Sequence, residues 1–255
     1  MNDLNLYERF LSASEAIRSR FQYESNRAFF LGNNQLPTIK FSADNFIQYS
    51  TLPGLDDQKI RAGGIYFGEL APGALVVTEP VFESGIRYDV RLKALGIRLL
   101  QLLGIEELIV FGKGEQLKGD AIEEQLFWAE DHINLSGSNP LVGANVDEFG
   151  ERFPDMTGVY DSELTTEGIK VTENLGVNTK KGVWASDWNE KFLPENLIDT
   201  LLKIKVDVIS NQGMQEVITA AHGKTRTALT LFINVGEKED ELLYKMLRSL
   251  SSGSK

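Results

Sequence analysis

Short apolar runs alternate with amphipathic stretches along most of this chain, and this alternation constrains its fold more than any other feature. Strand-like runs occur at residues 65–67, 74–78, 108–111, 126–129, 182–185, 206–209 and 228–233, and another begins at Arg27 and enters a Gly-Asn-Asn turn. Helical periodicity is found around residues 7–17, 88–103, 194–202, 215–222 and 242–250. Residues 161–175 are polar, with mixed helical and turn features. Strands that alternate with helices predict an α/β fold with a mostly parallel or mixed central sheet and helices on both faces.

Composition narrows the class of protein. With 255 residues, the chain can bury a full core, so we expect one domain over residues 1–255. There is no cysteine, no basic start followed by an apolar block, and no apolar run long enough for a membrane span. The net charge of −11 disfavours nucleic acid as a partner. We therefore expect a cytoplasmic protein with neither membrane nor nucleic-acid contacts.

The segment Asp131–Asp161 has Gly, Ser, Asn and Pro spaced through it and shows no helical or strand period. Long loops of this kind in compact domains are usually functional or form interfaces. The segment contains Asp-His-Ile-Asn-Leu, then Asn-Pro-Leu, then Arg-Phe-Pro-Asp-Met, and it ends with Tyr-Asp. In this order and spacing, the motifs resemble those of the trimeric purine nucleoside phosphorylases.

Fainter similarities to the same family extend along nearly the whole chain, at Ser50–Gly54, Leu102–Ile105 and Glu216–Ile218. The resemblance implies a single-domain, three-layer α/β sandwich around a mixed sheet, assembled as a ring of three subunits. It also implies that Phe153, in the Arg-Phe-Pro motif, reaches into the neighbouring active site. The alternative is that Phe153 packs in its own core, as isolated aromatic residues usually do.

Phosphorolysis of a purine nucleoside requires an anion held beneath the anomeric carbon and stabilisation of the charge that grows on the departing base. The family resemblance implies four phosphate-binding segments, and all four are altered here. The first, a Gly-Ser-Gly-Leu-Gly turn, is replaced by Gly32–Leu36, where Asn33 is the substrate-binding candidate. The second, an Arg-x-His pair, is replaced by Glu79–Phe82, which adds a carboxylate that would repel phosphate.

The third and fourth segments are altered as well. Phe111–Glu115 stands in place of Thr-Asn-Ala-Ala-Gly, and Lys113 is its candidate anion contact, with a solvated loop lysine as the alternative. Ser210–Gly213 stands in place of Gly-Met-Ser-Thr, and Asn211 is the substrate-binding candidate there.

On the purine side, the resemblance implies two catalytic candidates. Asn234 is in register with the purine-binding asparagine of the family, and Glu190 corresponds to the family glutamate after a shift of a few positions. The family histidine that contacts ribose has no counterpart in Gly236–Asp240.

Two hypotheses follow. In the first, the chain is a purine nucleoside phosphorylase-family protein with weak or no activity because its phosphate site is degraded. In the second, it is a non-catalytic subunit or nucleoside-binding partner of an active homologue. Neither requires a metal or cofactor, and phosphate would be the co-substrate of an active form. We expect a homotrimer or a hetero-oligomer with a homologue.

Overall fold

The computed structural model describes residues 5–21, 25–32, 43–56, 58–68, 75–84, 90–117, 125–186 and 194–251. The strands are β1 (Arg27–Leu31), β2 (Phe46–Gln48), β3 (Ile60–Ala62), β4 (Gly64–Phe67), β5 (Leu75–Thr78), β6 (Val81–Phe82), β7 (Glu107–Lys113), β8 (Glu115–Gln116), β9 (Gln125–Asn134), β10 (Asn178–Ser186), β11 (Val206–Ser210) and β12 (Arg226–Ile233). The helices are α1 (Leu6–Arg20), α2 (Leu95–Leu103), α3 (Ser162–Asn174), α4 (Glu195–Lys203), α5 (Met214–His222) and α6 (Glu239–Ser251), and a 3-10 turn, η3 (Val90–Ala94), precedes α2.

Ten of the strands form one sheet in the order β2-β4-β5-β1-β7-β12-β9-β10-β11-β8. Strand β1 is parallel to both β5 and β7, and all five of its residues are buried, which is typical of a central parallel strand. Strand β12 is parallel to β7 but antiparallel to β9, so the sheet is mixed as predicted. A single residue, Gly114, separates β7 from β8, and β8 pairs with β11. Because β8 continues β7 and also pairs with β11, the strands β7, β12, β9, β10 and β11 form a closed set.

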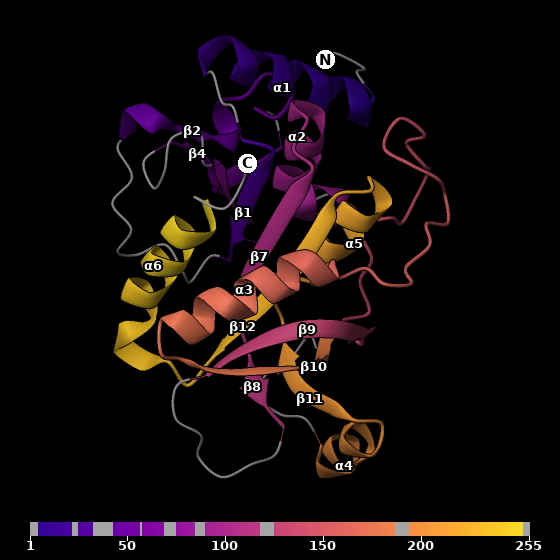
Figure 1. Cartoon of the computed structure of the whole chain (residues 1–255). Coiled ribbons are helices and arrows are strands. Elements are labelled where there is room, and N and C mark those ends of the chain that lie inside the picture. Colours follow the sequence, from indigo (N-terminus) through magenta and orange to yellow (C-terminus); the bar gives the residue numbers. More distant parts are fainter. Residues whose placement is uncertain are drawn as a thin grey trace.

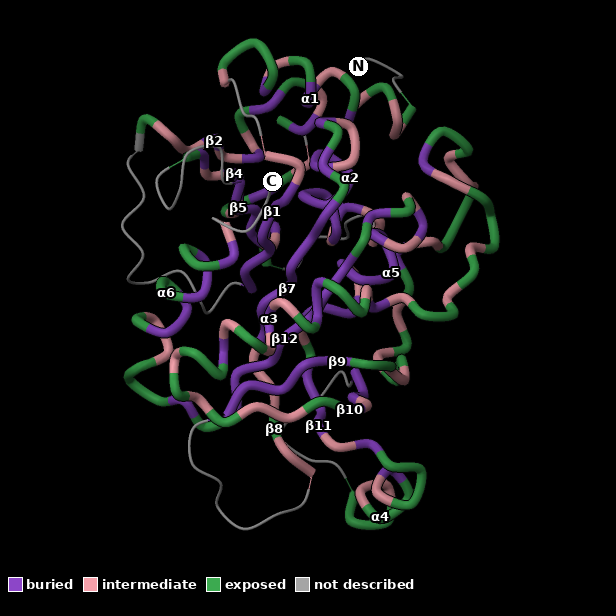
Figure 2. Tube along the Cα trace, viewed as in Figure 1, coloured by how far each residue is buried: buried purple, intermediate pink, exposed green. Residues whose placement is uncertain are grey.

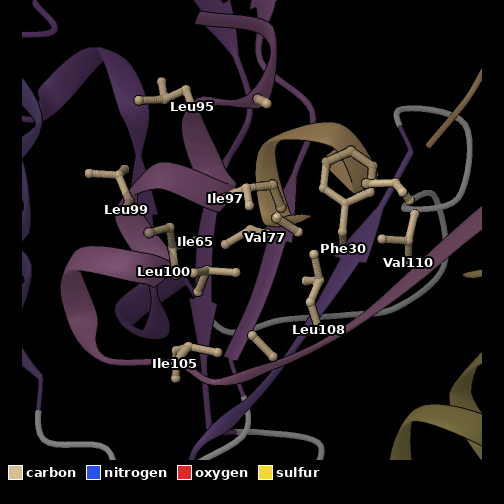
Figure 3. Close-up of a cluster of buried hydrophobic side chains, with 14 of the residues drawn as sticks. Phe30, Ile65, Val77, Leu95, Ile97, Leu99, Leu100, Ile105, Leu108 and Val110 are labelled. Atoms are coloured by element: carbon tan, nitrogen blue, oxygen red, sulfur yellow. The ribbon is translucent and has the colours of Figure 1, made fainter. Parts of the chain in front are cut away.

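Helices cover both faces of the sheet, which confirms the predicted α/β architecture (Figure 1). Helices α1, α2 and α5 pack on one face, and α3 and α6 pack on the other. Figure 3 shows how apolar side chains of α2 meet those of β1, β4 and β5, among them Leu99, Phe30 and Val77. The strands are buried along most of their length, whereas the segment that follows β9 is mainly exposed or half-buried (Figure 2).

Local sequence signals account for several helix ends. The side chain of Asn5 accepts a hydrogen bond from the Glu8 amide, and Glu8 accepts one from Asn5 in return, a capping box that starts α1. At the end of α2, Gly104 adopts a left-handed conformation with a φ of 87°, as its sequence position predicts.

Three expectations need correction. The first four residues of the Asp131–Asp161 segment belong to β9, because their backbone pairs with β10. The polar stretch after it is the regular helix α3, capped by Asp161, whose carboxylate accepts the amides of Glu163 and Leu164. The helix predicted from residue 88 begins as a described α-helix only at Leu95, after η3.

In the described ranges, no helix is both long and apolar enough to cross a bilayer.

Candidate functional site

The ends of β1, β7, β11 and β12 meet at one edge of the sheet. Ser210, the last residue of β11, donates its hydroxyl to the carbonyl of Lys113 at 2.7 Å. Lys113 ends β7 and is paired with Phe232 of β12. Ligands of open α/β sheets bind at such strand ends, particularly where the topology changes direction. This edge is therefore the first candidate binding site.

Gln212 fills the centre of this edge. Its Oε1 accepts the backbone N–H of Lys113 at 2.8 Å, and its own N–H donates to Ser210 Oγ at 3.0 Å. A Cβ atom placed on Gly32, directly after β1, would lie 3.0 Å from the Gln212 carboxamide. The side chain therefore covers Gly32 and occupies a backbone donor that a bound anion would otherwise use.

The predicted site residues of this edge take different positions. Lys113 places its Nζ 2.8 Å from Glu239 Oε2 at the start of α6. Asn211 and Asn234 are both exposed, and Asn234 has a φ of 54°, a left-handed conformation that asparagine tolerates better than most residues. Asn33 and Glu190 lie outside the described residues. The roles of all five residues remain predictions.

Two carboxyl groups lie near the same edge, of which one is half-buried and the other buried. Glu79 directly follows β5, and Glu216 is in the first turn of α5 with an exposed fraction of 4%. Burial, reinforced by the charge of Glu79, raises the pKa of Glu216 to about 8, although Lys93 acts in the opposite direction. Burial also raises the pKa of Glu79. The raised pKa favours the neutral form of Glu216 at neutral pH, so repulsion of an anion at this part of the edge comes from Glu79 in its ionised form.

Glu216 predicts a specific pH dependence of stability. A folded-state pKa raised above the ordinary value of 4.5 means that its stabilisation is complete below pH 4.5 and is lost as pH rises through about 8. We expect the free energy of unfolding in urea to fall across this window by on the order of a few kcal/mol. In Glu216→Gln this decline should be largely absent, whereas the exposed-site control Glu237→Gln should follow the wild type. Parallel curves for all three proteins would contradict the prediction.

The second candidate site lies on the Asp131–Asp161 segment. A pocket of about 450 Å³ is lined by His132 and Asn134 from β9, by Ile218 from α5, and by residues of the segment that include Arg152 and Phe153. Phe153 is 84% exposed, so the alternative in which it fills its own core is wrong for the isolated chain. An exposed aromatic ring beside a pocket is typical of a surface that contacts a ligand or another chain.

A buried hydrogen-bond chain holds the base of this segment. Trp184 Nε1 donates to the Tyr160 hydroxyl at 2.7 Å, and that hydroxyl lies 3.0 Å from Nδ1 of His132. The hydroxyl accepts from the indole, and its contact with Nδ1 is compatible with both neutral tautomers of His132, since a hydroxyl can either donate to the ring nitrogen or accept from it. Burial lowers the pKa of His132 despite the nearby charge of Asp131, in agreement with a neutral ring. His132 thus has a structural role in this hydrogen-bond chain.

Removal of the Tyr160 hydroxyl tests this chain. In Tyr160→Phe, the fully buried N–H of Trp184 loses its acceptor, so we expect about 1 to 3 kcal/mol less stability in urea unfolding. The control Tyr244→Phe changes a tyrosine that is 42% exposed and should cost little. Equal losses in the two variants would contradict a structural role for the chain.

Sequence reasoning did not identify Gln212 as the residue at the centre of the edge. A usable signal existed, because Gln212 stands where the resembling motif has its phosphate-binding serine. A long amide side chain at a position that should admit an anion indicates a filled site. Among the described residues, no cluster of three or more His, Cys, Asp or Glu side chains has the spacing to hold a metal ion.

Comparison with known proteins identifies the superfamily of the chain. The sequence model of the phosphorylase superfamily matches residues 38–237, and the chain belongs to that superfamily. Purine nucleoside phosphorylase 1 of Bacillus subtilis is 27% identical over 182 residues, which cover 71% of this chain and 67% of that protein. A putative purine nucleoside phosphorylase of Schizosaccharomyces pombe is 36% identical over 163 residues, 60% of this chain and 50% of that protein.

Solved structures support the fold. A purine nucleoside phosphorylase of Schistosoma mansoni, complexed with a novel monocyclic inhibitor, matches with a TM-score of 0.81 at 22% identity over 97% of both chains. A second structure of this kind, in complex with ribose 1-phosphate, matches with a TM-score of 0.79 at 21% identity. Within the superfamily, the chain is thus a divergent purine nucleoside phosphorylase-family protein.

Proposed function

We propose that this protein binds purine nucleosides at the strand-end edge and that its phosphorolysis is weak or absent. The observation that carries the proposal is the hydrogen bond from the Lys113 N–H to Gln212 Oε1, at 2.8 Å. In a phosphorolytic site, the backbone donors around the anion must be open to it. Here Gln212 Oε1, a neutral acceptor, already accepts one of these donors, the Lys113 N–H.

Charge around the edge supports the same conclusion. Glu79 is half-buried there, and its ionised carboxylate would repel phosphate, whereas the raised pKa of Glu216 favours its neutral form. Lys113 has a partner in Glu239, so it would have to break that ion pair before serving as a replacement cation for phosphate. We propose that Asn234 binds the base. We also propose that Asn33, Asn211 and Glu190 take part in nucleoside binding, and none of these roles depends on phosphate.

A second candidate function rests on Phe153. An aromatic side chain that is 84% exposed next to a pocket of about 450 Å³ favours a contact with another subunit. The chain would then form a ring of three, or would assemble with an active homologue and insert Phe153 into the neighbouring site. In this case the protein serves as a partner subunit rather than as an enzyme.

Calorimetric titration tests the first proposal. We expect inosine or guanosine to bind while phosphate, titrated to millimolar concentrations, gives no heat of binding. A phosphorolysis assay at high enzyme concentration should give base release far below the 1 to 10³ s⁻¹ typical of enzymes. Phosphate binding together with base release at such rates would overturn the proposal, and a lack of nucleoside binding would leave only the partner function.

Native mass spectrometry tests the second candidate function. The wild-type chain should form a trimer, alone or with an active homologue, and Phe153→Ala should weaken the assembly. Leu11→Ala, which changes an apolar residue that is 37% exposed on α1, is the matched control. A homotrimer that exchanges no subunits with a homologue would exclude the mixed assembly.

A further inference from the structure

Behind the Asp131–Asp161 segment lies a small cavity between α1, η3, α2, α5 and the loop, with a mainly apolar wall into which a few polar side chains project. It has a volume of about 30 Å³, and the residues that line it include Arg91, Arg98, Asn145, Thr219 and His222. This volume admits one water-sized species and is far too small for a nucleoside. The cavity is thus separate from the pocket beside Phe153, although Leu141 lines both.

The guanidinium of Arg98 is buried at this cavity without a carboxylate partner. Arg98 is 8% exposed, and it donates to Gln101 Oε1 at 2.9 Å and to His222 Nδ1 at 2.8 Å. Its carbon Cζ lies 4.4 Å from the centroid of the Phe149 ring. Both hydrogen-bond acceptors are neutral, and no Asp or Glu is among the described residues that line the cavity. A buried charge is costly unless an opposite charge lies near it.

His222 and Thr219 each bring a group to the cavity that can donate a hydrogen bond. His222 accepts the Arg98 proton at Nδ1, so its own proton is on Nε2. Among the described residues Nε2 has no hydrogen-bond partner of normal geometry, although the backbone of Glu151 acts to raise the pKa of the ring. The hydroxyl of Thr219, which is 1% exposed, also has no partner among the described residues. Burial lowers the pKa of Arg98 to about 10, in agreement with a cation that the protein leaves incompletely compensated.

We propose that this cavity binds one small monovalent anion, with chloride as the natural probe, held by Arg98 and Thr219. A water molecule would satisfy hydrogen bonds but would leave the charge of Arg98 uncompensated, whereas a halide satisfies both needs. Arg91, a second cation at the cavity wall, adds to the positive potential. Leu141, Asn145 and Phe149 of the loop line the cavity, so a bound anion would fasten the loop that carries Phe153 to α2 and α5.

Chloride can be tested directly on the full chain. Thermal unfolding is measured in sodium chloride and in sodium gluconate at equal ionic strength, and the ³⁵Cl line width is recorded by NMR. For the wild type we expect a chloride-specific rise in Tm of roughly 3 to 6 °C for each tenfold increase above Kd, together with ³⁵Cl broadening. Arg98→Gln should lose both effects, and Arg61→Gln, at an exposed arginine of β3, should keep them.

A second variant keeps the test independent of folding. Thr219→Val removes a hydroxyl that has no protein partner, so in gluconate it should be at least as stable as the wild type, yet its chloride affinity should fall at least threefold. Equal Tm values in chloride and gluconate, with an unbroadened ³⁵Cl line, would show that the cavity holds water and would overturn the proposal. A chloride response that survives both Arg98→Gln and Thr219→Val would place the ion elsewhere and would also overturn it.

Discussion

Phosphate is expected to bind to Gln212→Ser at millimolar concentrations at which we expect no binding to the wild-type protein. The substitution removes the carboxamide that accepts the Lys113 N–H and covers Gly32, and it leaves a hydroxyl of the kind that coordinates anions. We expect the affinity for phosphate to rise at least tenfold, which corresponds to about 1.4 kcal/mol. Isothermal calorimetry with inorganic phosphate measures the change, and a phosphorolysis assay shows whether base release accompanies it.

The matched control is Gln215→Ser. Gln215 lies three residues further along, and its side chain makes only a long contact of 3.5 Å to the Ser138 carbonyl. The Gln215→Ser substitution should leave the affinity for phosphate unchanged. If Gln212→Ser and Gln215→Ser are both silent toward phosphate, then Gln212 is not what blocks the anion, and the carboxyl groups near the edge become the next residues to change.

Arg27→Met is expected to cost the protein about 3 to 5 kcal/mol of unfolding free energy. Arg27 opens β1, is 4% exposed, and bonds to Glu107 at 2.8 Å, to Glu167 at 2.7 Å and to the carbonyl of Leu250 at 2.7 Å. Its loss removes the partner of two carboxylates, although Arg226 still reaches Glu107 at 2.7 Å. Urea unfolding of the purified variant gives the difference directly.

Arg61→Met is the control for this change, because Arg61 is exposed on β3 and the same atoms are removed. It should shift the unfolding free energy by less than about 0.5 kcal/mol. A loss below 1 kcal/mol in Arg27→Met would mean that Arg226 alone compensates Glu107. Double replacement of Arg27 and Arg226 would then show a loss much greater than the sum of the single losses.

Hydrophobic periodicity predicted the architecture of this protein well. Continuous apolar runs such as Ala228–Ile233 identified central strands, and the spacing of Leu242 to Leu250 identified the helix that packs beneath them. Secondary structure was harder to predict in polar stretches. Helix α3 carries only a few buried side chains, and its start depends on a cap by Asp161 rather than on an apolar stripe, so its periodicity was weak.

The site was less predictable, because its residues come from separate strand ends. Motif comparison gave Lys113 and Asn211 as candidates, and their roles remain predictions. The contact between Gln212 and Lys113 links positions 99 residues apart and depends on how β7 and β11 are brought together. The burial of Glu216 likewise becomes visible only once α5 is placed on the sheet. Exposure of Phe153 could not be derived from its neighbours in sequence, since the same motif is compatible with a buried ring.

The outermost strands of the large sheet have a consequence for how this protein can meet other chains. In the described part of the molecule, β2 at one end has three residues, and β8 at the other has two and is joined to β7 by Gly114 where the strands close, so neither end exposes a long strand. Such short edges offer little backbone to an incoming strand, which protects a protein with a long sheet from edge-to-edge aggregation. Association through strand addition is therefore disfavoured, and we expect specific assembly to use side-chain surfaces. One candidate is the surface around Phe153, the most exposed large apolar side chain among the described residues.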